Sequence, residues 1–313
     1  MNSVEGHCGE PKPRAKRGGK RSNLDHSRQV LRTEKPLQGR AVYATEEGRK
    51  RLLKILQFYD FIAKREPRAD ISIEDPQVIA VANVLEQLAR GVPPQYILGR
   101  AVFMGNTFYC TSDTLIPRPE TGVLVQTACD YLEEKKRNGS PAQTVIEIGT
   151  GCGNIAVSLA MRCDEGVRIL ASDISPAAVE VARRNVQKYQ VDGSVSLFCG
   201  DLYEPFREHQ GAADMVICNP PYIPTSSLKK LARQIIDHEP VLALDGGPYG
   251  LGIFRRLLSG APAFLKKGGV LAFEIGEGQE KLIERLLSGS GAFENIRFFE
   301  YEGKVRVISA TKK

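Results

Sequence analysis

A glycine-rich turn between a short apolar run and a helical pattern constrains the fold of this 313-residue chain more than any other feature. Residues 145–148 read Val-Ile-Glu-Ile, which is typical of a buried parallel strand, and an apolar helical pattern runs from Asn154 to Arg162. A glycine turn in this place lets the backbone approach a ligand closely and presents the free N–H groups of a helix start. The residues of the turn are Gly149, Thr150, Gly151, Cys152 and Gly153.

An acidic residue after the next predicted strand supports a ligand-binding turn. The apolar segment 167–171 ends in Ser172-Asp173, and Asp173 stands 24 residues after Gly149. An acid at the end of the second strand of a Rossmann-like unit can accept hydrogen bonds from ribose hydroxyls. A loop aspartate before a helix would give the same pattern, but the turn and the acid together indicate a nucleoside-containing cofactor.

The spacing of the glycines distinguishes two such cofactors. A nicotinamide dinucleotide motif has the form Gly-x-Gly-x-x-Gly, whereas here Gly153 comes one residue early and Ala156 follows. The spacing therefore favours S-adenosylmethionine. A third predicted strand, 194–199, ends in Gly200-Asp201-Leu202, and we expect Asp201 and Leu202 to meet the edge and face of an adenine.

Four residues after the fourth predicted strand, Asp214 to Cys218, indicate the acceptor; they are Asn219, Pro220, Pro221 and Tyr222. An amide or exocyclic amine nitrogen is a poor nucleophile because its lone pair is delocalised, so a site must bind both N–H groups and aim the lone pair. We expect Asn219 and the Pro220 carbonyl to accept those hydrogens and Tyr222 to stack on the planar acceptor. The prolines hold the loop rigid. A proline-rich turn that only closes a strand is the alternative.

The remaining patterns alternate between helices and strands. They predict helices over 119–137 and 176–189, the second with Ser175 as N-cap, and a fifth strand over 269–275. Segments 296–301 and 305–311 predict a closing hairpin. This order predicts a doubly wound α/β fold with a mostly parallel sheet and an antiparallel edge.

The positive charge of the chain lies in its first 40 residues. Residues 1–40 hold ten Lys and Arg against four Asp and Glu, which equals the net charge of +6 for the whole chain. Such a segment cannot bury enough apolar surface to fold alone, so we expect a basic disordered tail. It could contact RNA weakly through its charge. A transit peptide is disfavoured by the four acidic residues.

Helical patterns follow the tail. Apolar residues at helical spacing predict helices over 46–65 and from Pro76 onward, the second with Val78, Ile79, Ala82, Leu85 and Leu88 on its buried face. We therefore expect three parts: a tail over 1–40, a small helical substrate-recognition domain over 41–92 and a catalytic domain over 93–313. Seven Cys and four His form no metal-ligand pattern. The odd cysteine count and the lack of a signal-like or membrane-spanning run favour the cytoplasm.

Further short motifs occur along the second part of the chain. They are Gly91–Gly99, Phe103-Met104-Gly105, Leu115–Thr121, Glu239-Pro240, Ala243–Gly247, Gly268-Gly269 and Glu274-Ile275-Gly276. With these and the Asn-Pro-Pro-Tyr loop, the chain from Gly91 to Gly278 resembles the HemK/PrmC family, the protein-(glutamine N5) methyltransferases that modify bacterial-type peptide chain release factors.

The resemblance implies a seven-stranded class I methyltransferase fold with a small N-terminal helical domain that helps to recognise the protein substrate. It also implies that residues 149–153, Asp173, Leu202 and Asn219 touch S-adenosylmethionine, and that residues 219–222 hold the glutamine. The chain departs from the usual family pattern in three places. Gly122 stands where the family usually has an acid, and Pro248-Tyr249 stands where it has a residue followed by Asp. Leu202 stands where relatives often have an aromatic residue.

The leading functional prediction is methyl transfer from S-adenosylmethionine to a glutamine side-chain nitrogen, in the Gly-Gly-Gln motif of release factors. The main alternative is an amino-group methyltransferase acting on adenine in DNA or RNA, which uses the same loop. The neutral charge balance beyond residue 40 disfavours it. A binding protein without turnover and a nicotinamide oxidoreductase are less favoured. Arg118, Glu120, His238 and Glu239 could form structural ion pairs or touch the substrate.

Overall fold

The computed structural model describes residues 46, 48, 50, 76–140, 142–163 and 166–313. The chain divides into two compact units, Met1–Arg90 and Gly91–Lys313. The predicted tail over 1–40 lies outside the described residues, as does the predicted helix over 46–65 apart from three positions. None of the described helices is long and apolar enough to cross a bilayer.

Helix α3, Pro76–Ala89, is the described element of the first unit. Val78 and Ala82 are buried, as predicted, but Ile79 and Leu88 are 38% and 41% exposed. The prediction of a buried face was too wide. Val78 and Ala82 lie one turn apart on one line of the helix, and at about 100° per residue Ile79 and Leu88 lie to either side of that line.

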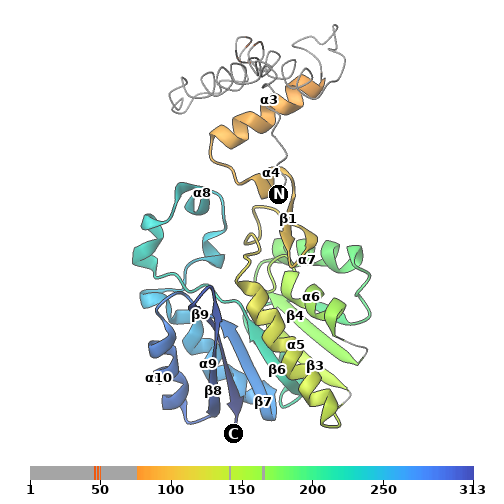
Figure 1. The fold of residues 1–313 in the computed structure, drawn as a ribbon, viewed down its shortest axis with the longest axis vertical. Helices are drawn as coiled ribbons and strands as arrows, with labels where there is room; N and C mark the ends of the chain where they lie inside the picture. The colour runs from red at the N-terminus through yellow and green to blue at the C-terminus, as the bar shows by residue number, and fades with distance from the viewer. Residues whose placement is uncertain (1–45, 47, 49, 51–75, 141, 164–165) are drawn as a thin grey trace, which may run out of the picture. The chain divides into compact units, whose positions relative to one another are not determined.

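A seven-stranded sheet forms the centre of the second unit, with the order β5-β4-β3-β6-β7-β9-β8 (Figure 1). Strands β3 to β7 are parallel, and β9 runs antiparallel between β7 and β8. This is the predicted doubly wound sheet with an antiparallel hairpin at its edge. The strands are β3 Gln143–Ile148, β4 Val167–Asp173, β5 Val195–Cys199, β6 Ala213–Cys218, β7 Leu265–Glu274, β8 Phe293–Tyr301 and β9 Lys304–Lys312.

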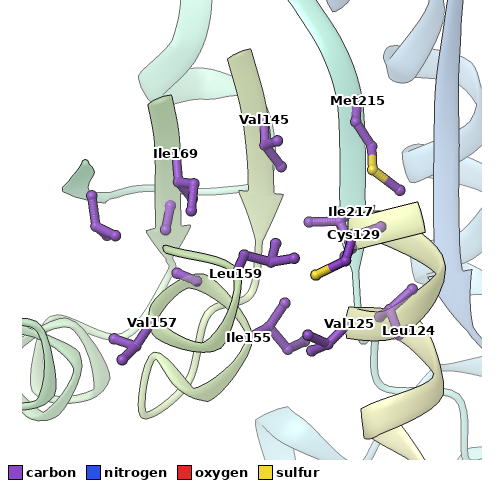
Figure 2. Close-up of a cluster of buried hydrophobic side chains, with 14 of the residues drawn as sticks. Leu124, Val125, Cys129, Val145, Ile155, Val157, Leu159, Ile169, Met215 and Ile217 are labelled. Atoms are coloured by element: carbon purple, nitrogen blue, oxygen red, sulfur yellow. The ribbon is translucent and has the colours of Figure 1, made fainter. Parts of the chain in front are cut away.

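Helices cover both faces of this sheet. The strands alternate their side chains between two apolar clusters: Val145 of β3 belongs to one and Ile146 to the other. Helices α5 Thr121–Arg137, α6 Asn154–Arg162 and α7 Pro176–Lys188 pack on the first cluster. Figure 2 shows its centre, where side chains of α5 and α6 meet those of β3, β4 and β6. Helices α9 Gly252–Phe264 and α10 Glu280–Ser290 pack on the second cluster.

Helix α7 begins as its sequence predicts. The Ser175 hydroxyl accepts a hydrogen bond from the Ala178 N–H at 3.2 Å, and Pro176 occupies the first helical position. On the same helix, the buried Asn185 side chain bonds the backbone N–H and C=O of Tyr109 and donates to the Cys152 carbonyl at 2.8 Å. One amide therefore fixes the glycine turn against α7.

Sequence reasoning missed the smaller elements. A hairpin of β1 Arg100–Phe103 and β2 Asn106–Tyr109 turns at Met104-Gly105, where both residues have positive φ. A two-residue turn of this kind is normally signalled by Asn or Asp before Gly, and methionine gives no such signal. The short helical segments are α4 Pro94–Ile97, η1 Glu204–His209, η2 Thr225–Lys230, α8 Arg233–Ile236, η3 Val241–Ala243 and η4 Pro248–Gly250.

Candidate active site

A cavity of about 270 Å³ lies at the carboxyl ends of the parallel strands. Loops after strands of a doubly wound sheet converge at this edge, which is where such folds bind ligands. Of the residues predicted to bind the cofactor, all except Gly153 line this cavity: Gly149, Thr150, Gly151, Cys152, Asp173, Asp201, Leu202 and Asn219. The structure therefore brings together residues from four separate loops.

The glycine turn between β3 and α6 forms one wall of the cavity. Gly149 and Gly151 have φ of +72° and +56°, which residues with a Cβ rarely adopt, and open space faces both. Gly153 serves packing instead, because a Cβ there would stand 3.2 Å from the Cβ of Ala182 in α7. The turn thus exposes backbone to the cavity at two glycines and anchors itself on α7 at the third.

Asp173 ends β4 beside this turn. Its carboxylate accepts the Gly151 N–H at 2.8 Å and the Ser175 N–H at 2.9 Å. Burial raises the pKa of Asp173, and these backbone N–H groups oppose the rise. Each carboxylate oxygen has further lone pairs, so an acceptor pair is available to ligand hydroxyls at the cavity wall.

The loop after β5 holds a contact that the sequence did not indicate. Asp201 forms an ion pair with Arg256 of α9 at 2.6 Å, and both side chains line the cavity. Leu202 has a left-handed backbone with φ of 50° and packs partly against the apolar cluster under α9. Leu202 is therefore the apolar group on this wall, and the Asp201 carboxylate is engaged by a cation.

Polar groups without partners lie under the turn. Within the described residues, the Glu147 carboxyl oxygens and the Thr150 and Ser172 hydroxyls are buried and have no partner in good hydrogen-bond geometry, although the Thr150 hydroxyl and the Ala156 N–H lie close enough to Glu147 to lower its pKa somewhat. Burial raises the pKa of Glu147 to about 8, and the charge of Asp173 adds to the rise. Thr150 and Ser172 also line the cavity. The Thr150 and Ser172 hydroxyls, beside a glycine turn and an aspartate, suit a ligand with both hydroxyl and amino groups, as S-adenosylmethionine has.

A second cavity of about 160 Å³ adjoins the first. Asn219 and Pro220 line both cavities, whereas Tyr222 and Glu120 line only the smaller one. The Asn-Pro-Pro-Tyr loop after β6 therefore stands where the two cavities meet. Neither the Asn219 side-chain oxygen nor the Pro220 carbonyl accepts a hydrogen bond from the part of the chain that the structure describes.

Side chains from distant segments hold this loop. The Asn219 amide donates to the Thr121 hydroxyl at 3.2 Å, and the Tyr222 hydroxyl donates to Glu274 at 3.2 Å. Arg306 of β9 donates to the Tyr222 hydroxyl at 3.0 Å and lies over its ring. Burial raises the pKa of Tyr222, with the charge of Glu274 adding to the rise, so the phenol stays protonated.

Two glycines lie in close contact with the backbone of the Asn-Pro-Pro-Tyr loop. A Cβ on Gly246 would stand 2.8 Å from the Pro221 carbonyl oxygen, and one on Gly250 only 2.1 Å from that of Tyr222. The Gln279 amide also donates to the Tyr222 carbonyl at 3.1 Å. This close contact gives a physical reason for glycine at both positions and adds rigidity beyond that of the two prolines.

Three of the four ambiguous charged residues, Arg118, Glu120 and Glu239, form ion pairs. Arg118 pairs with Glu239, whose carboxylate is buried and also accepts the Ile116 N–H at 3.4 Å. Glu120 pairs with Arg306 at 3.4 Å and makes no capping bond at the start of α5. The two acids therefore have structural partners, and Arg118 additionally lines both cavities.

Proteins of a known family are similar in sequence to most of this chain. A release factor glutamine methyltransferase of Moorella thermoacetica is 37% identical over 252 residues, covering 79% of this chain and 86% of the relative. That of Bacillus cereus is 33% identical over 239 residues, covering 76% and 83%. The chain belongs to the family of release factor glutamine methyltransferases. The model of the methyltransferase small domain also matches, over residues 131–248.

The fold agrees with this family. The solved hMettl16 catalytic domain, in complex with MAT2A 3'UTR hairpin 6, is 14% identical and superposes with a TM-score of 0.53, covering 75% of this chain and 81% of that one. At this identity the likeness concerns the fold alone. The predicted class I methyltransferase fold, the enzyme class and the dependence on S-adenosylmethionine are confirmed, while the individual ligand residues of this methyltransferase stay predictions.

Proposed function

We propose that this chain transfers a methyl group from S-adenosylmethionine to the side-chain nitrogen of a glutamine in the Gly-Gly-Gln motif of a peptide chain release factor. The observation that carries the proposal is the position of Asn219 and Pro220 on the boundary between the two cavities. The related release factor glutamine methyltransferases supply the substrate class.

The larger cavity would hold the cofactor. Asp173 offers its carboxylate to the ribose hydroxyls, and Gly149 and Gly151 offer close approach of the backbone. The Thr150 and Ser172 hydroxyls would form hydrogen bonds with the amino acid end of the cofactor. When bound there, S-adenosylmethionine supplies an electrophilic methyl carbon next to the Asn-Pro-Pro-Tyr loop.

The smaller cavity would hold the glutamine side chain. The Asn219 side-chain oxygen and the Pro220 carbonyl accept its two N–H hydrogens, which directs the nitrogen lone pair toward the larger cavity. Tyr222 offers a ring to the planar carboxamide, and Arg306 and Glu274 hold the phenol in place. Methylation turns the amide nitrogen into a strong acid, so its extra proton passes to water without a dedicated base.

Positioning is thus the main contribution of the protein. Correct orientation of two reactants can lower a barrier by up to about 7–11 kcal/mol. The nearby carboxylates have other tasks: Glu239 pairs with Arg118, and Glu274 accepts from Thr121 and Tyr222. They hold the walls of the cavities, which agrees with a reaction that needs alignment rather than a general base.

We extend the proposal to the protein substrate and the setting of the reaction. The helical part over 41–92 would help to bind the release factor, and residues 93–313 would carry the catalytic domain, with the reaction taking place in the cytoplasm. Weak RNA contact through the basic tail over 1–40 remains a prediction from charge alone.

Mass spectrometry tests this proposal directly. The purified chain is incubated with methyl-labelled S-adenosylmethionine and, in separate reactions, a release factor, the same factor with glutamate in place of the motif glutamine, and unmodified DNA or RNA. We expect label on the motif glutamine and none on the glutamate variant or the nucleic acids. Label on adenine alone, or on a different residue of the release factor, would overturn the proposed substrate.

A further inference from the structure

A chain of hydrogen bonds links the catalytic loop to a buried acid far away in the sequence. The Asn219 Nδ2 donates to the Thr121 Oγ1 at 3.2 Å, and the Thr121 hydroxyl donates to the Glu274 Oε2 at 2.6 Å. Thr121 begins α5 and Glu274 ends β7, and both side chains are almost fully buried. The three residues come from three different elements.

The direction of these bonds follows from their chemistry. An ionised carboxylate can only accept, so the single hydroxyl hydrogen of Thr121 must point at Glu274. The Thr121 oxygen then has only lone pairs left for Asn219, which must therefore turn its NH₂ group toward Thr121. This leaves the Asn219 Oδ1 on the side of the cavities. The orientation of an amide is assigned from such networks rather than from the shape of the group.

We propose that Glu274 and Thr121 are positioning residues that set the orientation of the Asn219 amide, so that the site presents an acceptor to a substrate nitrogen carrying hydrogens. This inference rests on the proposed function and deepens it, because it explains why the site selects an N–H donor. With the opposite amide orientation, Asn219 would present its NH₂ group to the substrate NH₂ group, and two donors cannot bond.

Two donors keep Glu274 in its accepting role. The other carboxylate oxygen, Oε1, accepts the Tyr222 hydroxyl at 3.2 Å and faces an Arg306 nitrogen at 3.4 Å. Burial raises the pKa of Glu274, and the Thr121 hydroxyl and the Arg306 cation oppose that rise. The Glu120 charge adds to the rise, so the accepting role of Glu274 rests on the geometry: hydroxyl donors on both carboxylate oxygens and the Arg306 cation beside Oε1.

We call the hydrogen-bond chain from Asn219 through Thr121 to Glu274 the relay. Glu274→Gln tests the direction of its hydrogen bonds with little change in the shape of the side chain. Because Arg306 and Tyr222 both donate toward Oε1, the new amide oxygen would take that side and its NH₂ group would face Thr121. The Thr121 hydroxyl would then donate to Asn219, which would turn its oxygen away from the cavities. Thr121→Val removes the relay by replacing the hydroxyl with a methyl group of similar size.

A matched control lies on the same helix. The Thr127 hydroxyl of α5 is buried and donates to the Val123 carbonyl at 2.8 Å, away from the loop. Thr127→Val therefore removes a buried hydroxyl from α5 without touching the relay. Thr121→Ser keeps the hydroxyl and serves as the conservative rescue.

The first readout is the kinetics with a release factor as acceptor. We expect Thr121→Val and Glu274→Gln each to lower kcat by about 10- to 100-fold. Because Thr121 also lines the larger cavity, cofactor affinity by calorimetry should fall by less than about fivefold, well below the loss of kcat, and Thr121→Ser should recover most of the lost kcat. Thr127→Val should behave as wild type. An unchanged kcat in Thr121→Val, or equal losses in Thr121→Val and Thr127→Val, would overturn the relay.

The second readout does not depend on any acceptor. The side-chain amide signal of Asn219 in nitrogen-15 spectra is assigned by its loss in Asn219→Ala. We expect Thr121→Val and Glu274→Gln to shift this signal and speed its exchange with solvent, while Thr127→Val leaves it in place. An unmoved signal in both relay variants rejects the inference. If wild type methylates no release factor, the proposed function fails, and this measurement still tests the relay; if Glu274→Gln does not fold, Thr121→Val decides.

Discussion

The two cavities of the candidate site are built in different ways. In the cofactor half, Asp173 binds backbone N–H groups of Gly151 and Ser175, which stand 22 and 2 residues away in the chain. In the acceptor half, Asn219 and Tyr222 are held by side chains that stand 98 and 84 residues away. The first half is local backbone geometry, and the second exists only once α5, β7 and β9 have packed. Substitutions should therefore reduce binding in one half and turnover in the other.

The largest effect that this contrast predicts is for Asn219→Ala. Loss of the proposed acceptor for the glutamine nitrogen should lower kcat by about 1000-fold or more, because on this proposal alignment supplies most of the rate. Cofactor affinity should fall by less than about fivefold, since the Asp173 side is untouched. Single-turnover kinetics and calorimetry measure the two quantities. Asn138→Ala, at the exposed end of α5, is the control. Equal losses of affinity in Asn219→Ala and Asp173→Ala would break the division between the halves.

Local construction explains why the cofactor half was predictable from the sequence. The turn at 149–153 needs glycines with positive φ, and a ribose-binding acid must follow the next strand, so both features leave a fixed spacing in the chain. The strand and helix patterns around them likewise predicted a doubly wound, mostly parallel sheet with an antiparallel edge, whereas the order of the strands came from the structure. Asp201 was placed at the cavity, but its partner Arg256 was missed because it comes from α9.

The acceptor half was predictable only in its loop. The four residues from Asn219 to Tyr222 are contiguous, and their chemistry could be read directly. Their supports could not, because an isolated Thr121, Glu274 or Arg306 has no spacing that relates it to the loop. Glu274 appeared only within a Glu-Ile-Gly motif, and nothing in that motif shows that its carboxylate is buried and bonded to α5 and the loop.

The next largest effect concerns the ion pair that joins two walls of the acceptor half. Arg118 and Glu239 stand 121 residues apart, and the Glu239 carboxylate is buried. Arg118→Ala leaves that charge unpaired and should lower the free energy of unfolding by about 3 kcal/mol. Adding Glu239→Gln should restore part of the loss, since the buried charge is then gone. Arg183→Ala, which breaks the exposed pair with Glu180, should cost under about 1 kcal/mol.

Denaturant unfolding of wild type, Arg118→Ala, Glu239→Gln, the double variant and Arg183→Ala measures these differences. Non-additivity of the Arg118 and Glu239 substitutions gives the interaction energy of the pair. If Arg118→Ala is no more destabilising than Arg183→Ala, the pair does not help to hold the acceptor half together. The acceptor half would then depend less on contacts between distant segments than the comparison with the cofactor half implies.

The cofactor half has a buried carboxyl group, Glu147, and its effect on stability depends on pH. The pKa of Glu147 is about 8 in the folded chain because of burial, above the usual value of 4.5. Between these values the folded state keeps a proton that the unfolded state has lost, so the free energy of unfolding falls as pH rises. From pH 6 to pH 8 the loss should be about 2 kcal/mol, at up to about 1.4 kcal/mol per unit. Glu147→Gln cannot titrate and should flatten this dependence; parallel pH profiles for both proteins would show that Glu147 is not the cause.

The smallest effect should come from Asp173→Ala. Loss of the carboxylate removes the proposed acceptors for the ribose hydroxyls and the observed acceptors for the Gly151 and Ser175 N–H groups, so cofactor affinity should fall by about 10- to 20-fold. At saturating cofactor, kcat should stay within about threefold of wild type, because the Asn219 side remains intact. Asp192→Ala is the matched control, since this exposed aspartate lies just before β5, at the amino ends of the parallel strands and away from the cavity. Calorimetry and steady-state kinetics separate the outcomes. A large loss of kcat at saturation would mean that the glycine turn also aligns the reacting groups, and the two halves would then act as one.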